Sequence, residues 1–126
     1  MKILTANKKF LHVHGGYLPH YRGSTTNYYS LIKENFLGAS SLFLTSNIDE
    51  GHILIREKFL PPQDRNDIDH NYDSKIRSIV LIKTLKKYIE LSSWDFGVED
   101  NEKGEYYYII HPVLKHLAII DTKSFS

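Results

Sequence analysis

The stretch between His12 and Gly23 constrains the fold of this chain more than any other. A short apolar run ends at His12 and His14, and glycines and a proline follow directly. Alternate residues of a β-strand point to one face of a sheet, so the two histidine rings are expected to share a face. Glycine and proline interrupt strands, so residues 14–23 are predicted to form a loop. Open α/β sheets place their sites where a strand gives way to a loop, which makes this junction the first candidate site.

Apolar spacing elsewhere predicts an alternation of strands and helices. The expected order is strand, helix, strand, strand, helix, strand, helix, which is typical of an α/β or α+β domain. Strands are expected at residues 9–13, 40–45, 52–59 and 105–110, and helices at about 25–36, from about 74 for some four turns, and from 112 to 117. In the last strand, the middle one of Tyr106, Tyr107 and Tyr108 should face away from the other two.

Local signals predict where some of these elements begin and end. Ser24 or Thr25 can cap the first helix through a side-chain oxygen. Gly38 lies just past the end of that helix, where glycine is favoured. Residues 63–73 include four aspartates and are predicted to be an exposed loop. Pro112 suits the first turn of the last helix.

The composition restricts the class of protein. A length of 126 residues suggests one domain, and 41% hydrophobic and 25% charged residues are ordinary for a soluble globular chain. The net charge of +1 argues against nucleic-acid binding by bulk electrostatics. The absence of cysteine excludes disulfides, zinc-thiolate sites and a cysteine nucleophile. With no signal-peptide core at the N-terminus and no apolar run near the ~20 residues that cross a bilayer, a cytoplasmic protein without membrane contact is expected.

Three patterns follow one another along the first half of the chain. Residues 14–23 read HGGYLPHYRG, residues 38–40 read GAS, and residues 48–54 read IDEGHIL. In order and spacing they are similar to the HPSLLPxYRG, GVT and IDxGxIL motifs of the formyltransferase family. This family includes methionyl-tRNA, glycinamide-ribonucleotide and amino-sugar N-formyltransferases. The chain resembles a bacterial branch that carries His-x-His before the first motif.

The resemblance implies an α/β fold, specifically a partial Rossmann-like formyltransferase domain that lacks the N-terminal β-α units of the family. Residues 1–126 are expected to form a single formyltransferase-like domain, either whole or truncated. Its motif core covers about residues 8–62, and a helix-strand-helix segment follows at about residues 74–118. The strand at residues 9–13 would then lack its usual neighbours, so a homodimer or a partner chain that supplies the missing strands is expected.

The resemblance also implies an activity, which is transfer of a formyl group from 10-formyltetrahydrofolate to the amine of a small substrate such as a nucleotide-linked amino sugar. No metal is expected. Carried over by position, His14 and Asp49 take the places of the catalytic histidine and aspartate, and His12 takes that of the catalytic asparagine. The resemblance further implies cofactor-binding residues Asn47, Asp49 and Gly51, and substrate-binding residues Tyr21, Arg22 and Gly23.

Formyl transfer gives each catalytic position a task. Attack of an amine on a formyl carbon forms a tetrahedral oxyanion, which needs a hydrogen-bond donor aimed at it. The amine must also lose a proton, and imidazole is a suitable base near neutral pH. We therefore expect His14 to handle the proton or the oxyanion, Asp49 to orient His14, and His12 to donate to the oxyanion. His12 departs from the family, because an amide donates at any pH whereas neutral imidazole donates from one nitrogen only.

Other interpretations of these residues remain open. His12-x-His14, with Asp49 or another histidine as a further ligand, is also a pattern of metal-dependent hydrolases. A non-catalytic remnant would instead pair its open sheet edge with another chain. Arg22 has a structural alternative, in which it bonds loop carbonyls rather than a substrate anion.

Overall fold

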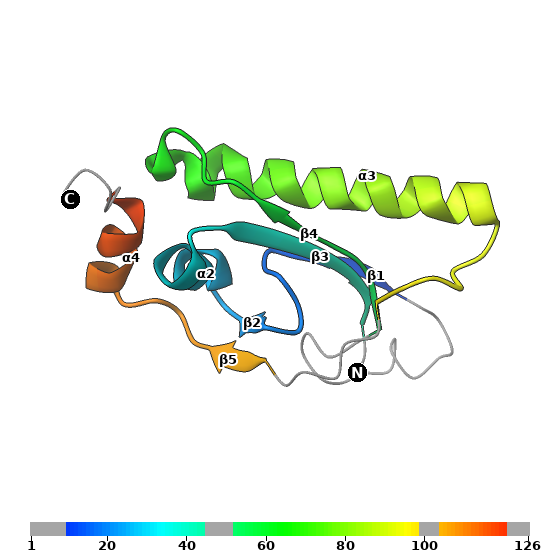
Figure 1. Cartoon of the computed structure of the whole chain (residues 1–126), viewed down its shortest axis with the longest axis horizontal. Coiled ribbons are helices and arrows are strands. Elements are labelled where there is room, and N and C mark those ends of the chain that lie inside the picture. Colours follow the sequence, from blue (N-terminus) through cyan, green and yellow to red (C-terminus); the bar gives the residue numbers. More distant parts are fainter. Residues whose placement is uncertain (1–9, 45–51, 99–103, 121–126) are drawn as a thin grey trace.

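A three-stranded antiparallel sheet lies at the centre of the molecule (Figure 1). The computed structural model describes residues 10–44, 52–98 and 104–120. The sheet has the order β1-β3-β4, with β1 at Leu11–His14, β3 at Leu37–Phe43 and β4 at Ile53–Phe59. A second pair joins β2 (Tyr21–Gly23) to β5 (Glu105–Tyr107) in parallel. With its helices, the chain belongs to the mixed α/β class that the sequence predicts.

Helices cover both faces of the sheet. In Figure 1, α3 (Asp73–Leu91) lies along one face and α2 (Thr26–Glu34) against the other. Two adjacent buried serines of β3 bond to segments on opposite faces of the sheet, one to α3 and the other to the loop at residues 16–18. The Ser41 hydroxyl lies 2.7 Å from that of Thr84 in α3. The Ser40 hydroxyl points to the opposite face, where it accepts from the Leu18 amide at 3.0 Å and donates to the Gly16 carbonyl at 2.8 Å.

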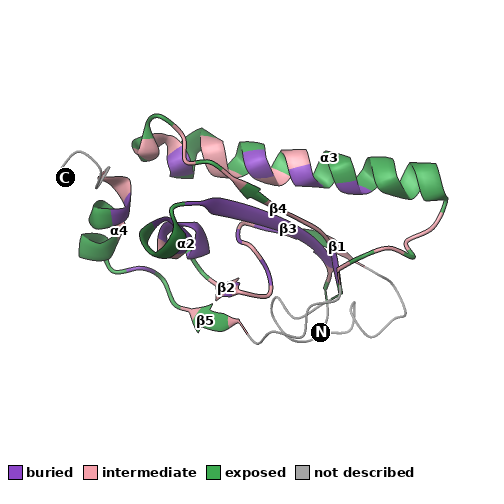
Figure 2. Cartoon of the chain, in the orientation of Figure 1, coloured by how far each residue is buried: buried purple, intermediate pink, exposed green. Residues whose placement is uncertain are grey.

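Apolar side chains form two cores around β3, which is buried almost along its whole length (Figure 2). The smaller core joins Leu18, Leu42 and Ile53. The larger core also takes in α4 (Pro112–Ile119), which packs against α2. Its buried members are Tyr28, Leu31, Leu37, Ala39, Ile68, Ile76, Val80, Ile110 and Ala118.

Several predicted elements are confirmed. Pro112 begins the last helix, and the His111 side chain caps it by accepting from the Val113 amide at 3.1 Å. Tyr107 stacks on the Tyr21 ring, whereas Tyr106 and Tyr108 are exposed and contact each other, as alternation requires. No described helix has both the length and the apolar character to cross a membrane.

Two loop predictions are wrong. Residues 14–23 contain β2, whose partner strand lies more than 80 residues away and leaves no local signal. Residues 63–73 are largely helical, with a 3₁₀-helix at Arg65–Asp67 (η1) and a π-helix at Ile68–Tyr72 (η2) that leads into α3. Burial of Ile68, which is 1% exposed, anchors this aspartate-rich segment against the core.

The predicted ends of the first helix are also corrected. Thr25 lies at its start with a φ of 52° and makes no side-chain cap; its hydroxyl accepts instead from the Ile110 amide at 2.9 Å. Asn35, with a φ of 57°, ends the helix. Gly38 belongs to β3, where a Cβ atom would lie 2.7 Å from that of Tyr17, so close packing rather than helix termination requires glycine.

Candidate functional site

His12 and His14 lie on the same side of the sheet but in different surroundings. They pair with Leu42 and Ser40 respectively, whose side chains face away from α3. His14 is only 8% exposed, whereas His12 is exposed. The strand therefore presents one enclosed and one accessible imidazole.

A backbone carbonyl fixes the His14 ring. The Nε2 atom of His14 lies 3.0 Å from the Tyr21 carbonyl oxygen, within the buried interior. A carbonyl oxygen only accepts hydrogen bonds, so Nε2 carries a hydrogen in this pair. In the neutral ring, Nδ1 is then the basic nitrogen. β2 thus sets both the orientation and the tautomer of His14.

The two glycines after His14 pack closely against the first turns of α2 and α3. A Cβ atom on Gly16 would lie 2.7 Å from His14 Nε2 and would also collide with the Thr26 hydroxyl. A Cβ atom on Gly15 would lie 2.7 Å from an Asp73 carboxylate oxygen. A side chain at Gly16 would therefore press on the His14 ring, whereas one at Gly15 would displace only the end of the Asp73 side chain.

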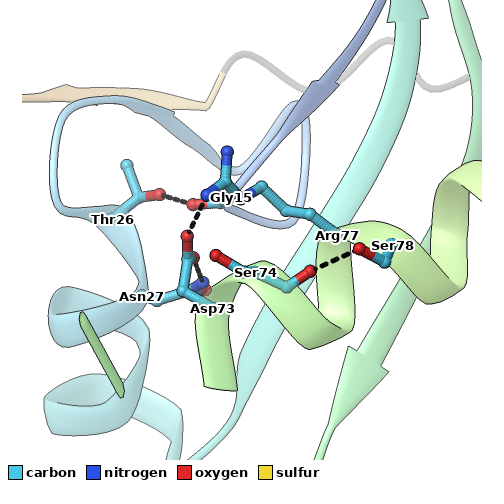
Figure 3. Close-up of polar contacts among 7 residues, drawn as sticks. All are labelled: Gly15, Thr26, Asn27, Asp73, Ser74, Arg77 and Ser78. Atoms are coloured by element: carbon cyan, nitrogen blue, oxygen red, sulfur yellow. Dashed lines mark hydrogen bonds and ion pairs between the residues drawn. The ribbon is translucent and has the colours of Figure 1, made fainter. Parts of the chain in front are cut away.

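A cavity of about 290 Å³ opens beside His14. Its polar walls come from the start of α2 and the start of α3, which the sequence did not link to the histidines. Figure 3 shows the cluster: the Asp73 carboxylate pairs with Arg77 at 2.8 Å and accepts from the Asn27 amide at 3.3 Å. The Thr26 hydroxyl donates to the Gly15 carbonyl at 2.7 Å. An aspartate and an arginine four residues apart at a helix start are the sequence signal that could have indicated this pair.

Asp69 and Tyr28 complete the cavity wall. Burial raises the pKa of the Tyr28 hydroxyl above its usual range, and its hydrogen bond to Asp69 raises it further. Burial alone would raise the pKa of Asp69, but hydrogen bonds from Lys115, at 2.6 Å, and from Tyr28 lower it overall. At neutral pH the cavity therefore holds an ionised Asp69 and a protonated Tyr28.

The three predicted substrate-binding residues join β2 to its neighbours. The Tyr21 hydroxyl bonds Glu34, and the Arg22 guanidinium donates to the Gly104 carbonyl at 2.9 Å. Gly23 has a φ of 104° and packs against the Tyr107 carbonyl. These contacts agree with the structural alternative for Arg22. Of the three, Gly23 lines the His14 cavity.

The predicted cofactor-binding residues Asn47, Asp49 and Gly51 lie outside the described residues, and so does the aspartate of the catalytic trio. The residues on either side are placed. The Leu44 amide donates to the Phe10 carbonyl at 2.8 Å, and Phe43 pairs with Leu11. The chain thus leaves β3 beside the start of β1, nearer to His12 than to His14.

The described part of the chain offers no ligand set for the hydrolase alternative. No group of three or more histidine, aspartate or glutamate side chains among these residues could hold a metal ion. His14 Nε2 bonds the Tyr21 carbonyl, and His52 Nε2 lies 3.0 Å from the Phe96 carbonyl. Since Asp49 is not among these residues, a site that includes it stays a prediction.

Comparisons with known proteins give matches among solved structures. No protein-family model matches the chain, and no curated protein matches it. HypX from Aquifex aeolicus, in complex with tetrahydrofolic acid, aligns with a TM-score of 0.63 and 18% identity over 84% of this chain and 18% of HypX. A 4-N formyltransferase from Francisella tularensis aligns with a TM-score of 0.62 and 20% identity over 86% of this chain and 50% of that enzyme.

The formyltransferase PseJ from Anoxybacillus kamchatkensis aligns with a TM-score of 0.60 and 18% identity over 78% of this chain and 51% of PseJ. This chain has the formyltransferase fold. It spans about half the length of PseJ and of the Francisella enzyme and less than a fifth of HypX. The formyltransferase fold expected from three short motifs is thus confirmed at sequence identities too low to transfer an activity.

Proposed function

We propose that this protein transfers a formyl group from 10-formyltetrahydrofolate to the amine of a small substrate, such as a nucleotide-linked amino sugar. The observation that carries the proposal is the position of His14, enclosed at the end of β1 of a formyltransferase fold and lining a polar cavity. Two solved neighbours support the choice of donor and acceptor. HypX was crystallised with tetrahydrofolic acid, and PseJ with tetrahydrofolate and a UDP-linked formamido sugar.

The reaction requires one proton to move. The amine nitrogen of the acceptor attacks the formyl carbon and forms a tetrahedral intermediate with a negatively charged oxygen. The bond between that carbon and N10 of the folate then breaks, which yields a formamide and tetrahydrofolate. The acceptor nitrogen loses a proton and N10 gains one, so a single base that becomes an acid can serve both steps.

His14 is suited to this proton transfer. Its Nε2–H is held by the Tyr21 carbonyl, so in the neutral ring Nδ1 is the basic nitrogen, and it would take the proton from the attacking amine. The protonated ring still donates from Nε2 to the same carbonyl, so it need not turn before returning the proton to N10. Tyr21 therefore has a positioning role through its backbone.

His12 and Asp49 complete the proposed site. His12, exposed two residues before His14, would donate to the oxyanion, which is the task of an amide in the family. Asp49 would orient His14, and Asn47, Asp49 and Gly51 would contact the folate. Neutral imidazole offers one hydrogen, so transfer by this chain should depend on pH more than transfer through an amide.

A partner chain forms part of the proposal. Among the described residues β1 is an outer strand of the sheet, and its outer edge would pair with a second copy or with another chain. Sedimentation of the purified protein tests this point, because a well-folded monomer at high concentration contradicts it. The lack of cysteine suits the cytoplasm, where folate-dependent transfer would take place.

Calorimetric titration with tetrahydrofolate tests the proposed function. We expect saturable binding to the wild-type chain, weaker binding to Asp49→Asn, and unchanged binding to Asp95→Asn, a control at an exposed aspartate. Absence of binding to the wild type overturns the proposal. Metal analysis of the same sample tests the hydrolase alternative. One metal ion per wild-type chain that is lost in His12→Ala and in His14→Ala would favour a hydrolase.

A further inference from the structure

The last described part of the chain exposes many apolar side chains. They lie on β5, on the segment that leads from it to α4, and on α4 itself, which is exposed over most of its length (Figure 2). We call this set the α4 surface, and its members, each between 42% and 78% exposed, are Tyr106, Tyr108, Ile109, Val113, Leu114 and Leu117. The three members on α4 share one face of the helix, because residues three and four apart are neighbours there.

The composition of α4 indicates that its outer face is covered in the assembled protein. Only Lys115 and His116 among its eight residues are polar. A helix that is apolar on nearly every side is typical of a buried position. In the described part of the chain, however, Ala118 is the one residue of α4 that is buried. Since a helix this short is marginally stable by itself, packing on its outer face would stabilise it.

The α4 surface is large enough for a stable protein interface. A fully exposed aromatic side chain offers roughly 150–250 Å². At that scale, the partly exposed side chains of the α4 surface together offer on the order of 600 Å². A standard interface buries about 800 Å² on each partner, and somewhat more than half of that area is apolar. The apolar area of the α4 surface therefore matches what one partner contributes to such an interface.

The charges beside the α4 surface are compatible with a second copy of the chain. In a two-fold interface the same surface meets itself, so a patch of one charge would repel its counterpart. Here the neighbouring charges are neutralised within the chain. Lys115 pairs with Asp69 at 2.6 Å, and Glu105 pairs with Lys33 at 3.7 Å. The α4 surface can therefore meet its own copy without bringing unpaired like charges together.

The exposed apolar stripe on α3 is less suited to such a contact. Ile82, Leu85 and Ile89 form this stripe. Lys75 and Lys86 lie along one edge of it, are exposed, and form no ion pair within the described residues. Two copies joined through α3 would bring these lysines together, which costs free energy. Of the two exposed apolar faces, the one on α4 is therefore the better candidate for contact between copies.

We propose that the α4 surface joins two copies of this chain across a two-fold axis. Val113, Leu114 and Leu117 of one copy pack against the same residues of the other, and Tyr108 and Ile109 border the contact. The inference does not depend on formyl transfer. It also leaves the outer edge of β1 to a different chain, because β1 and α4 lie in separate parts of the molecule (Figure 1).

Sedimentation velocity over a concentration series tests the inference. The wild-type chain should be a dimer, and Leu117→Glu should weaken dimerisation at least about thirtyfold, because it places a charge at the centre of an apolar contact. Ile89→Glu is the matched control, since it makes the same kind of change at an exposed apolar residue of α3, and it should remain a dimer.

Cross-linking locates the contact independently. The chain has no cysteine, so Val113→Cys introduces a single thiol at the proposed contact. A short bismaleimide should link two copies of Val113→Cys into a covalent dimer. The same reagent should leave Ile89→Cys largely unlinked.

Three results would overturn the inference. One is a wild-type chain that stays monomeric at high concentration. Another is a dimer that persists in Leu117→Glu, which would place the contact elsewhere, for example at the outer edge of β1. The third is equal weakening in Ile89→Glu, which would mean nonspecific association. If Leu117→Glu does not fold, as judged by circular dichroism, Ile109→Ser replaces it, because this exposed residue lies outside every described helix and strand.

Discussion

The two ends of β1 differ sharply although only a few residues separate them. At the His14 end, the strand is enclosed by the glycine turn, by the first turns of α2 and α3, and by β2. At the Leu11 end, it forms an outer edge of the sheet, and His12 is exposed. Side-chain alternation alone gives both histidines the same face. The packing of distant segments, rather than the strand itself, therefore decides which imidazole is fixed and which is accessible.

Replacement of each histidine by asparagine should separate the two ends of β1 by the largest difference in rate. His14→Asn removes the proposed base and should lower kcat/KM for formyl transfer by about 10²–10⁴-fold. His12→Asn introduces the amide that the family carries, so transfer should stay within about tenfold of wild type and should depend less on pH. Initial rates of tetrahydrofolate release over a pH series measure both effects. Equal losses in the two variants would contradict the separate roles of the two ends.

Gly16→Ala should have the next largest effect, because it tests the enclosure itself. The added methyl group would press on the His14 ring and the Thr26 hydroxyl, so the free energy of unfolding should fall by about 1–3 kcal/mol. Urea unfolding gives this value. Ser24→Ala, at an exposed site nearby, should shift it by less than about 0.5 kcal/mol. A Gly16→Ala protein as stable as Ser24→Ala would show that the turn does not pack as described.

The sequence predicted the fold better than it predicted the site. The α/β class, the histidines on one face of β1 and the start of α4 at Pro112 follow from local patterns, because periodicity and capping depend on near neighbours. β2 and η2 could not be predicted, since β2 needs a partner far along the chain and η2 needs the burial of Ile68. The same limit applies to the site.

Asp73 and Arg77 belong to the His14 cavity only because α3 packs across the sheet, and no pattern near His14 announces them. Periodicity could not link residues 14–23, 38–40 and 48–54 to one another. The resemblance to the family motifs did so, because the three segments follow in the same order and spacing. It also assigned Arg22 to the substrate, whereas the structure engages this side chain with the Gly104 carbonyl. The substrate-binding role of Arg22 thus stays a prediction beside its observed structural contact.

Tyr21→Phe should lower the free energy of unfolding by less than Gly16→Ala does. The variant loses the bond to Glu34 but keeps the backbone carbonyl, so stability at neutral pH should fall by about 1 kcal/mol. Burial and the Glu34 contact raise the pKa of Tyr21 in the folded protein. The stabilisation is therefore fully present below the unfolded pKa of 10.0 and is lost as the pH rises above it. Urea unfolding at pH 8 and above pH 10 measures the loss, with exposed Tyr106→Phe as control; a parallel pH profile in Tyr21→Phe and wild type would count against it.

Asp69→Asn should have the smallest effect on stability. Asp69 lines the cavity at the enclosed end of β1. The Asp69 side chain is 53% exposed, so its pair with Lys115 is screened and is expected to contribute less than about 1 kcal/mol. Because the pKa of Asp69 is lowered in the folded protein, its stabilisation is present above the unfolded pKa of 3.8 and is lost as the pH falls below it. The difference in stability between wild type and variant should thus vanish at acid pH. A difference that persists there would point to packing instead of charge.

The central claim is that the enclosed end of β1 carries out formyl transfer. Its most direct test follows the carbon itself, by incubating the chain with 10-formyltetrahydrofolate labelled with carbon-13 in the formyl group and a nucleotide-linked amino sugar. NMR of the products shows where the label goes. We expect a labelled formamide on the acceptor nitrogen, formed by wild type and at least about 10²-fold more slowly by His14→Asn. Label that stays on the folate, or that is released as formate, would contradict it.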